Sequence, residues 1–461
     1  MRRRWIPVVV AVIAMTMTGG PTSADHDVDA SRFSGVMAHQ AEDFEAVASN
    51  AAPNSSAPEG FAPCVNGMAA GTYPCDGIDM MSHLSLSDLG LSFGNDMWGW
   101  TDPQTRRDYA LIGGTEGTVI VDITDPQRPD VVGTLPAHTL DPGRPFWRDI
   151  KVFADHMFVV SEQTDHGMQV FDLTEVRGVT GAPVIFTETA HYDEISTSHN
   201  LNINSDTGFA YILGARDFDP TTTPPSRPLD CGGGLHMVDI GDPTNPTFAG
   251  CFGDNGYVHD TQCVIYRGPD ADHRGKEICF NSNAPGAYGS SNHWVDIVDV
   301  TDKSNPVSLD RESYPLSGFS HQGWLTPDQG FFLHGDEGDE VIHGLNTTTR
   351  VWDVRDLDNI QLIGVFQNDT TSIDHNVYTE GRVATASNYT SGLRVYDTRN
   401  VSAGELSDVA FFDVYPENDN ASFEGGTWSN YPYFKQKTIV AVSSIDRGLF
   451  VLRPRIGAVG N

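Results

Sequence analysis

Polar residue pairs that could do chemistry recur along this sequence about once every 50 to 60 residues, and four of them begin with histidine. Imidazole and carboxylate groups together can ligate a divalent metal ion, and histidine can transfer protons near neutral pH. If the fold brings these pairs together, they form a candidate ligand or metal site. The candidate residues are Asp96, Arg148, Asp149, His199, His259, Asp260, His321 and His375.

The regular spacing of the pairs also supports a structural interpretation, in which these groups bind one another, backbone carbonyls and water. Buried polar groups must be paired, and a structural device is copied together with the repeat that contains it. A catalytic site instead needs distinct residues in distinct roles. The repetition therefore favours a structural role over a metal or ligand site, and it favours either of these over catalysis.

Acidic loops form a second group of candidate metal ligands. In residues 335–340 the candidates are Asp336, Asp339 and Glu340, whose carboxylate oxygens are the hard ligands that Ca²⁺ takes. No loop has the spacing of an EF-hand, and such loops are more often solvated turns. We expect no required cofactor, and Ca²⁺ or another divalent metal is the ion these residues could hold. The other acidic loops are residues 254–256 together with Asp260, and residues 417–420 together with Glu424.

Several reaction signatures are absent from the chain. It lacks the H-E-x-x-H of zinc peptidases, a phosphate-binding loop and a dinucleotide-binding fingerprint. A propeller enzyme can still assemble its site from several blades, so an enzyme is not excluded. No catalytic residue is predicted, and a non-catalytic protein is the expectation.

Short β-strands must position these residues, because apolar runs of a few residues alternate with clusters of Gly, Asp, Asn and Pro. One run recurs seven times as a few β-forming residues closed by a polar residue, which is aspartate in every copy but the last. The polar pairs precede these runs in step, and Gly425-Gly426 occupies the seventh position. The closing residues are Asp122, Asp172, Asp239, Asp299, Asp353, Asp397 and Arg453.

Each repeat is predicted to hold four antiparallel strands, and a proline-containing turn precedes the fourth strand because proline cannot donate to a β-ladder. Four-stranded sheets packed around an axis bury both faces and line a channel with their first strands. We therefore predict an all-β, seven-bladed β-propeller over residues 61–454, with the polar pairs around its channel. The last repeat stops near Leu452, so an N-terminal strand at His83–Leu86 should close the ring.

The N-terminal residues predict export. Residues 1–24 have a basic start, an apolar stretch and a small-residue cleavage site, as in a signal peptide. Residues 25–60 read as a flexible linker and residues 455–461 as a polar tail. No second apolar stretch is long enough to span a bilayer, so no membrane insertion is expected after signal cleavage. The protein should be secreted, or periplasmic if the source has an outer membrane.

Six cysteines agree with an exported chain, since an even number in an oxidising compartment favours disulfides. Their positions suggest three local pairs. A zinc site is the alternative, although the chain contains no C-x-x-C pair. The suggested pairs are Cys64 with Cys75, Cys231 with Cys251, and Cys263 with Cys279.

The net charge of −34 excludes some classes of partner. Such an acidic surface repels nucleic acid and anionic lipid, so no nucleic-acid partner is expected. It serves as a solubility device in an extracellular or salty medium more often than as a cation-binding patch. A monomer is expected, and the natural partner would be an extracellular protein or glycan.

The aspartate-closed strand closely resembles the LVIVD repeat, and the whole arrangement is similar to the choice-of-anchor B family of exported proteins. The Cys64–Cys75 segment followed by Ile78–Leu86 matches the N-terminal segment of that family, and the histidine-led pairs match its later repeats. The resemblance covers about residues 61–454 and implies a propeller-like body. Family members differ in how they are tethered, and this chain ends without a sorting signal or transmembrane helix, which predicts free secretion.

The resemblance supplies no substrate. The sequence therefore predicts a secreted, non-catalytic propeller that acts as an extracellular binding or scaffold module. The alternative is a metal-dependent hydrolase or lyase with a histidine and carboxylate site in the central channel. Metal analysis combined with a chelator melt would separate the two.

Overall fold

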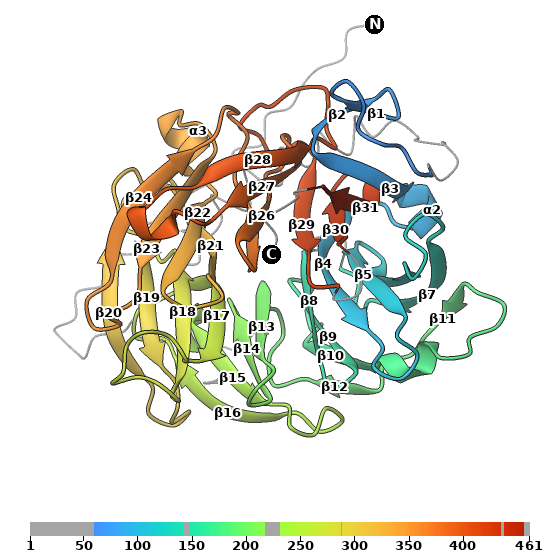
Figure 1. Ribbon diagram of the computed structural model, residues 1–461. Helices are drawn as coiled ribbons and strands as arrows, with labels where there is room; N and C mark the ends of the chain where they lie inside the picture. The colour runs from blue at the N-terminus through green and yellow to red at the C-terminus, as the bar shows by residue number, and fades with distance from the viewer. Residues whose placement is uncertain (1–59, 142–146, 217–230, 287, 435–437, 456–461) are drawn as a thin grey trace, which may run out of the picture.

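The computed structural model describes residues 60–141, 147–216, 231–286, 288–434 and 438–455 (Figure 1). The predicted signal peptide, nearly all of the predicted linker and residues 456–461 of the predicted tail lie outside these residues. Within the described ranges, no helix is long and apolar enough to cross a membrane.

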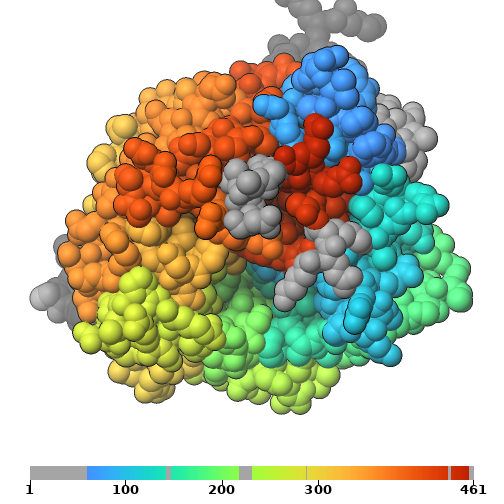
Figure 2. All heavy atoms as spheres, viewed as in Figure 1, coloured from blue at the N-terminus to red at the C-terminus, as the bar shows by residue number. Residues whose placement is uncertain are grey.

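Seven antiparallel sheets are arranged around one axis, and consecutive first strands contact one another in a closed ring (Figure 1). The predicted seven-bladed β-propeller is confirmed. The space-filling view shows a rounded disc, hollowed near its centre (Figure 2). The first strands of blades 1 to 7 are β4 (Gly94–Thr101), β8 (Arg148–Phe153), β13 (Asn200–Asn204), β17 (Val258–Ile265), β21 (Ser320–Leu325), β25 (Asn376–Glu380) and β29 (Thr427–Tyr431).

The second and third strands of every blade are almost wholly buried between neighbouring blades. The second strands are β5 (Asp108–Gly114), β9 (His156–Ser161), β14 (Phe209–Leu213), β18 (Glu277–Asn283), β22 (Phe331–Asp336), β26 (Val383–Ser387) and β30 (Val440–Ser444). The third strands are β6 (Gly117–Asp122), β10 (Met168–Asp172), β15 (Leu235–Asp239), β19 (Trp294–Asp299), β23 (Thr348–Asp353), β27 (Leu393–Asp397) and β31 (Gly448–Pro454).

The fourth strands lie on the outer side of the blades and are more exposed, except in blade 7, where every residue of the fourth strand is buried. In blades 1 to 7 they are β7 (Asp130–Pro136), β12 (Ala190–Tyr192), β16 (Thr247–Phe252), β20 (Val307–Ser313), β24 (Gln361–Gln367), β28 (Ser407–Phe412) and β3 (Ile78–Leu84). The described helices are α2 (Leu86–Leu89), α3 (Asp339–His343) and the 3-10 turns η1 (Leu173–Val176), η2 (Cys231–Gly233) and η3 (Val401–Ala403).

The repeated aspartate at the end of the third strand has a local structural role. Asp122 accepts a hydrogen bond from the backbone N–H of Thr124, and Asp299 accepts one from Thr301, at 2.9 and 3.0 Å. Asp239 and Asp353 cap the residue two positions further on in the same way. This side-chain turn starts the connection to the fourth strand, which explains why aspartate recurs with the repeat.

An N-terminal strand closes the ring, as predicted, although its boundaries differ from the expectation. Strand β3 pairs antiparallel with β31, from Ile78 opposite Pro454 to Leu84 opposite Leu449. The expected strand at His83–Leu86 is therefore wrong at its C-terminal end. Ser85 instead caps α2, because its hydroxyl accepts from the N–H of Asp88 while that carboxylate accepts from the N–H of Ser85.

Two blades carry more strands than the four predicted. In blade 6, β2 (Tyr73–Asp76) pairs with β28, and β1 (Met68–Ala69) pairs with β2. In blade 1, β11 (Val184–Ile185) pairs parallel with β7. These short strands cover sheet edges that would otherwise expose unpaired backbone groups.

All six cysteines are paired in the arrangement that the sequence suggested, and none is free. The Cys64–Cys75 bridge holds the N-terminal segment against blade 6 beside β2. The Cys231–Cys251 bridge joins η2 to β16, and the Cys263–Cys279 bridge joins the paired strands β17 and β18. The zinc alternative for these residues is therefore wrong.

Candidate functional site

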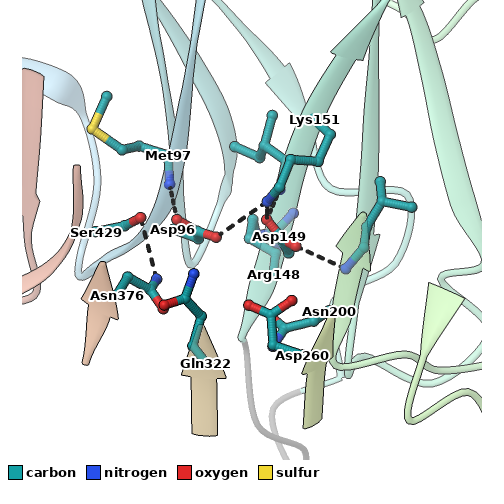
Figure 3. Close-up of polar contacts among 12 residues, drawn as sticks. Asp96, Met97, Arg148, Asp149, Lys151, Asn200, Asp260, Gln322, Asn376 and Ser429 are labelled. Carbon is teal, nitrogen blue, oxygen red and sulfur yellow. Dashed lines mark hydrogen bonds and ion pairs between the residues drawn. The ribbon is translucent and has the colours of Figure 1, made fainter. Parts of the chain in front are cut away.

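The channel is lined by two successive layers of side chains, one from each residue of the polar pairs. The seventh pair is Trp428-Ser429. The predicted pair Gly425-Gly426 is wrong, because those glycines precede β29, and a bulge in that strand places Trp428 in the same layer as the histidines. The first layer consists of Asn95, Arg148, His199, His259, His321, His375 and Trp428. The second layer consists of Asp96, Asp149, Asn200, Asp260, Gln322, Asn376 and Ser429 (Figure 3).

Second-layer side chains join neighbouring blades. Asp149 accepts a hydrogen bond from the backbone N–H of Leu201 in the next blade, at 2.7 Å. Gln322 both accepts from the N–H of Val377 and donates to its carbonyl, at 2.9 and 3.1 Å. Asn200 donates to the carbonyl of His259. Asn376 donates to the hydroxyl of Ser429 (Figure 3). These side chains replace the backbone ladder that adjacent blades lack.

One buried cation lies among the carboxylates of the second layer. The Nζ atom of Lys151 is 2.5 Å from Asp149 and 3.7 Å from Asp96 (Figure 3). Burial raises the pKa of Asp96 well above its ordinary value, and Asp149 raises it further. Burial also raises the pKa of Asp260 to about 7, which the charge of Lys151 only partly offsets. The second layer therefore holds more carboxylates than its cation can neutralise.

First-layer imidazoles follow one another around blades 3 to 6. Ring centroids are 4.5 Å apart for His199 and His259, and 4.3 Å apart for His259 and His321. His375 lies 4.3 Å beyond His321 and 4.7 Å before the indole of Trp428. The structure thus brings the four predicted histidines together as a continuous arc.

Hydrogen bonds to the next blade orient the imidazoles. The Nδ1 atom of His259 is 2.9 Å from the carbonyl of His321, and that of His375 is 2.5 Å from the carbonyl of Trp428. Because a carbonyl only accepts, Nδ1 carries the proton and Nε2 keeps its lone pair. Burial lowers the pKa of His375 to about 3 and holds the pKa values of His259 and His321 well below 6.5. These three imidazoles are therefore neutral.

His199 differs from the other three histidines. Its Nδ1 is 2.5 Å from the carboxylate of Glu162. Burial alone would lower the pKa of His199, but the hydrogen bond and the charge of Glu162 outweigh burial and raise it. His199 is thus the imidazole of the arc that favours the charged form.

Glu337 is a channel residue that the sequence did not predict, as are Lys151 and Trp428. Glu337 follows β22 directly, and its buried carboxylate accepts a hydrogen bond from the hydroxyl of Tyr389 at 2.6 Å. The carboxylate is 3.6 Å from Nε2 of His375 and 3.8 Å from Nε2 of His321. Burial raises its pKa to about 7. The only signal in the sequence was its place within the acidic loop 335–340.

The acidic loop 335–340 is not a solvated turn. Asp336, Asp339 and Glu340 are all buried, and Asp374 lies against them. Carboxylate oxygens of Asp339, Glu340 and Asp374 lie within 4.8 Å of one another, and Arg350 pairs with Asp339 at 2.6 Å. We call Asp339, Glu340 and Asp374 the acidic centre. Whether it holds a metal ion stays a prediction.

Asp336 belongs to a different environment from the acidic centre. Its carboxylate accepts from the backbone N–H groups of Gly318 and Phe319 and from the hydroxyl of Tyr314. These bonds and the charge of Arg350 outweigh the effect of burial and lower the pKa of Asp336. Both carboxylate oxygens of Asp336 therefore already accept hydrogen bonds from neighbouring protein groups.

The other two acidic loops are tied into the fold locally. Asn255 donates to Asp296 at 2.9 Å, and Asn418 donates to Glu424 at 2.8 Å. Glu417 pairs with Arg447 at 2.6 Å. These contacts tie Asn255, Glu417 and Glu424 to neighbouring residues of the fold.

Below the second layer, an aromatic cluster reaches across the channel. Trp98 in blade 1 and Tyr378 in blade 6 lie 5.8 Å apart, although blade 7 stands between their blades. Trp324 packs on Tyr378 at 5.0 Å, and Tyr431 packs on Tyr433 at 5.3 Å. The ammonium group of Lys151 lies 4.7 Å above the ring of Trp98, which links the cluster to the second layer.

An open cavity of about 430 Å³ lies beside this cluster, at the ends of the first strands of blades 4 to 6. Trp324 and Tyr433 contribute aromatic rings to its wall, and both are half-buried. Gln262, Thr379 and Glu380 contribute an amide, a hydroxyl and a carboxylate. This mixture of ring faces and hydrogen-bonding groups is typical of small-molecule sites.

Comparison with known proteins identifies the repeat. Residues 106–135 and 230–254 match the model of the LVIVD repeat. The chain contains LVIVD repeats. The first match spans β5, β6 and β7 in blade 1, and the second spans β15 and β16 in blade 3. No curated protein sequence matches the chain significantly.

Similar solved structures include two propellers of very different sequence. The β-propeller domain of Cps50 (Swd1) from Myceliophteria thermophila is 11% identical, with a TM-score of 0.46, over 78% of this chain and 96% of that domain. The WD40 repeats of RRP9 are 8% identical, with a TM-score of 0.48, over 79% of this chain and 94% of that one.

Proposed function

We propose that this LVIVD-repeat propeller is an exported, non-catalytic binding protein that recognises a neutral oligosaccharide at the aromatic end of its channel. The signal-peptide-like residues 1–24 and three disulfides support export, because disulfides persist in oxidising compartments. Membership of the choice-of-anchor B family, free secretion and a monomeric state belong to the same proposal.

The cavity beside Trp324 and Tyr433 is the observation that supports a sugar ligand. Sugar rings present C–H faces that pack on aromatic rings and hydroxyls that bond to amide and carboxylate groups. Gln262 and Glu380 place such groups beside the aromatic wall. The net charge of −34 opposes anionic glycans, which leaves neutral ones as the favoured class.

Binding to an array of neutral oligosaccharides, followed by titration calorimetry, tests the proposal. Trp324→Ala and Tyr433→Ala should each weaken binding by about tenfold or more, because an aromatic anchor contributes most of the affinity of its pocket. Phe248→Ala is the matched control, since Phe248 is an exposed aromatic residue of the outer strand β16. No sugar bound by the wild type, or equal binding by all variants, would contradict the proposal. Capture of a protein through the same cavity would assign a protein partner instead.

A second candidate function, a metal-dependent hydrolase or lyase, has one observation in its favour. Two imidazoles and a carboxylate meet at the other end of the channel, and this is a ligand composition of catalytic zinc sites. The candidate requires turnover of an ester, peptide or glycoside that chelation abolishes. Turnover unaffected by chelator, or none with any of these substrates, would exclude it.

A further inference from the structure

We propose that the histidine end of the channel binds one divalent first-row metal ion, through Nε2 of His259 and His321 and the carboxylate of Glu337. One ligand atom from each of these residues lies within 4.8 Å of the others, and all three side chains are buried. His375 lies beside this group, because its Nε2 is 3.6 Å from the other oxygen of the same carboxylate, which also accepts from Tyr389. This site is independent of the proposed sugar cavity at the opposite end.

The tautomers of the arc suit metal ligation. His259 and His375 each donate Nδ1–H to a carbonyl of the next blade, so that Nε2 keeps its lone pair. Metal-binding histidines are generally held in this way by an acceptor on the other ring nitrogen.

The distances to Glu337 fit a shared ion better than direct hydrogen bonds. Its Oε2 lies 3.8 Å from Nε2 of His321, and its Oε1 lies 3.6 Å from Nε2 of His375, both beyond hydrogen-bond range. Two ligands of one tetrahedral ion with bonds of about 2.0–2.1 Å are separated by roughly 3.4 Å. One oxygen of Glu337 is fully buried and has no hydrogen-bond partner among the described residues. A metal ion would satisfy that oxygen.

The ligand set selects the kind of metal. Imidazole nitrogen together with one carboxylate suits Zn²⁺, Co²⁺ or Ni²⁺, whereas Ca²⁺ takes oxygen ligands. A second histidine cluster, formed by His138, Glu188 and His191, lies at the outer edge of blades 1 and 2. Its two imidazoles are stacked 3.8 Å apart and nearly parallel, so an ion cannot lie in the plane of both rings. The channel is therefore the better site.

Titration of chelator-treated full-length protein with Zn²⁺, and of a second sample with Co²⁺, tests the inference without any sugar ligand. We expect one ion per chain, a higher melting temperature with Zn²⁺, and visible Co²⁺ absorption bands typical of nitrogen and oxygen ligation. Glu337→Gln, which preserves shape, and His321→Ala should each weaken binding by about 10-fold to 100-fold or more.

His156→Ala is the matched control, because His156 is a half-buried histidine at the start of β9, outside the channel, and its Nδ1 contacts the carbonyl of Ala154. Circular dichroism melts of every variant in chelator establish that it is folded. Failure of the wild type to bind Zn²⁺ stoichiometrically would overturn the inference. Zn²⁺ binding that persists in Glu337→Gln and His321→Ala but is lost in His191→Ala would also overturn the inference, because that ion would lie at the outer edge. Neither outcome affects the sugar proposal, which is measured on Trp324→Ala.

Discussion

The two layers of the channel arise from adjacent residues of the same strands, yet they differ in how their polar groups are used. In the second layer, Gln322, Asn200 and Asp149 are bonded to backbone groups of the next blade. In the first layer, His259 and His375 use only one ring nitrogen for such a bond. The other nitrogen of each faces a buried carboxylate that comes from a loop.

This difference separates a structural device from a candidate ligand site. A group that is repeated and fully bonded in successive blades needs no ligand to explain it, since buried polar groups must be paired. A buried carboxylate with an unpartnered oxygen does need an explanation, and Glu337 occurs in one blade only. The structural interpretation of the polar pairs therefore fits the second layer, and the ligand interpretation fits the first.

The largest expected effect distinguishes the layers directly. Gln322→Ala should lower the free energy of unfolding by about 2–4 kcal/mol, because it leaves both backbone groups of Val377 without partners. His321→Ala in metal-free protein should cost less than half of that, since only a polar wall of the channel is altered. Urea unfolding of both variants in chelator provides the measurement. Equal losses would remove the distinction between the layers.

Asp260→Asn tests the unneutralised charge of the second layer. The pKa of Asp260 is about 7 in the folded protein and near 3.8 when unfolded, so the folded state binds more protons between these values. The stability of the wild type therefore falls as pH rises from about 4 to about 7, and the variant lacks this fall. Across that range the variant should gain roughly 2–4 kcal/mol relative to the wild type. Parallel pH dependences of unfolding would contradict the raised pKa.

Asp374→Asn tests whether the acidic centre behind the first layer holds a cation, because the sign of its effect on stability depends on that. In chelator the variant should be more stable than the wild type by about 1–2 kcal/mol, because it removes one of three adjacent buried carboxylates. Thermal melts with chelator and with excess Ca²⁺ check this. If the variant is less stable, and only the wild type gains stability from Ca²⁺, the centre holds a cation.

The smallest expected effect on stability concerns His199, the one histidine of the arc that favours the charged form. Because the pKa of His199 is raised in the folded state, its pairing with Glu162 stabilises the protein fully below about pH 6.5 and is lost as pH rises through the folded value. Glu162→Gln should therefore cost about 1 kcal/mol more at pH 5.5 than at pH 9. Chemical unfolding at the two pH values measures the difference. A cost independent of pH would show that His199 is neutral like its neighbours.

Local patterns predicted most of the fold. Asp122, Asp299 and their equivalents end the third strands because aspartate caps the following turn through its own side chain, and such a signal depends only on neighbouring residues. The count of seven repeats and the pairing of cysteines close in sequence were predictable for the same reason. Errors arose where a neighbouring signal competed, as when Ser85 began a helix and a bulge moved Trp428 into the channel.

The contents of the site were decided by tertiary structure. The sequence by itself determined that His199, His259, His321 and His375 would face a common axis, because each heads the first strand of its blade. It could not place Glu337 beside them, or Asp374 beside Asp339, because those contacts depend on where loops between strands return. The aromatic cavity likewise joins residues from blades 4 to 7. The alternation of residues along a strand determines which side chains are buried, and it can be read from the sequence. Contacts between side chains of different blades form only when the ring closes.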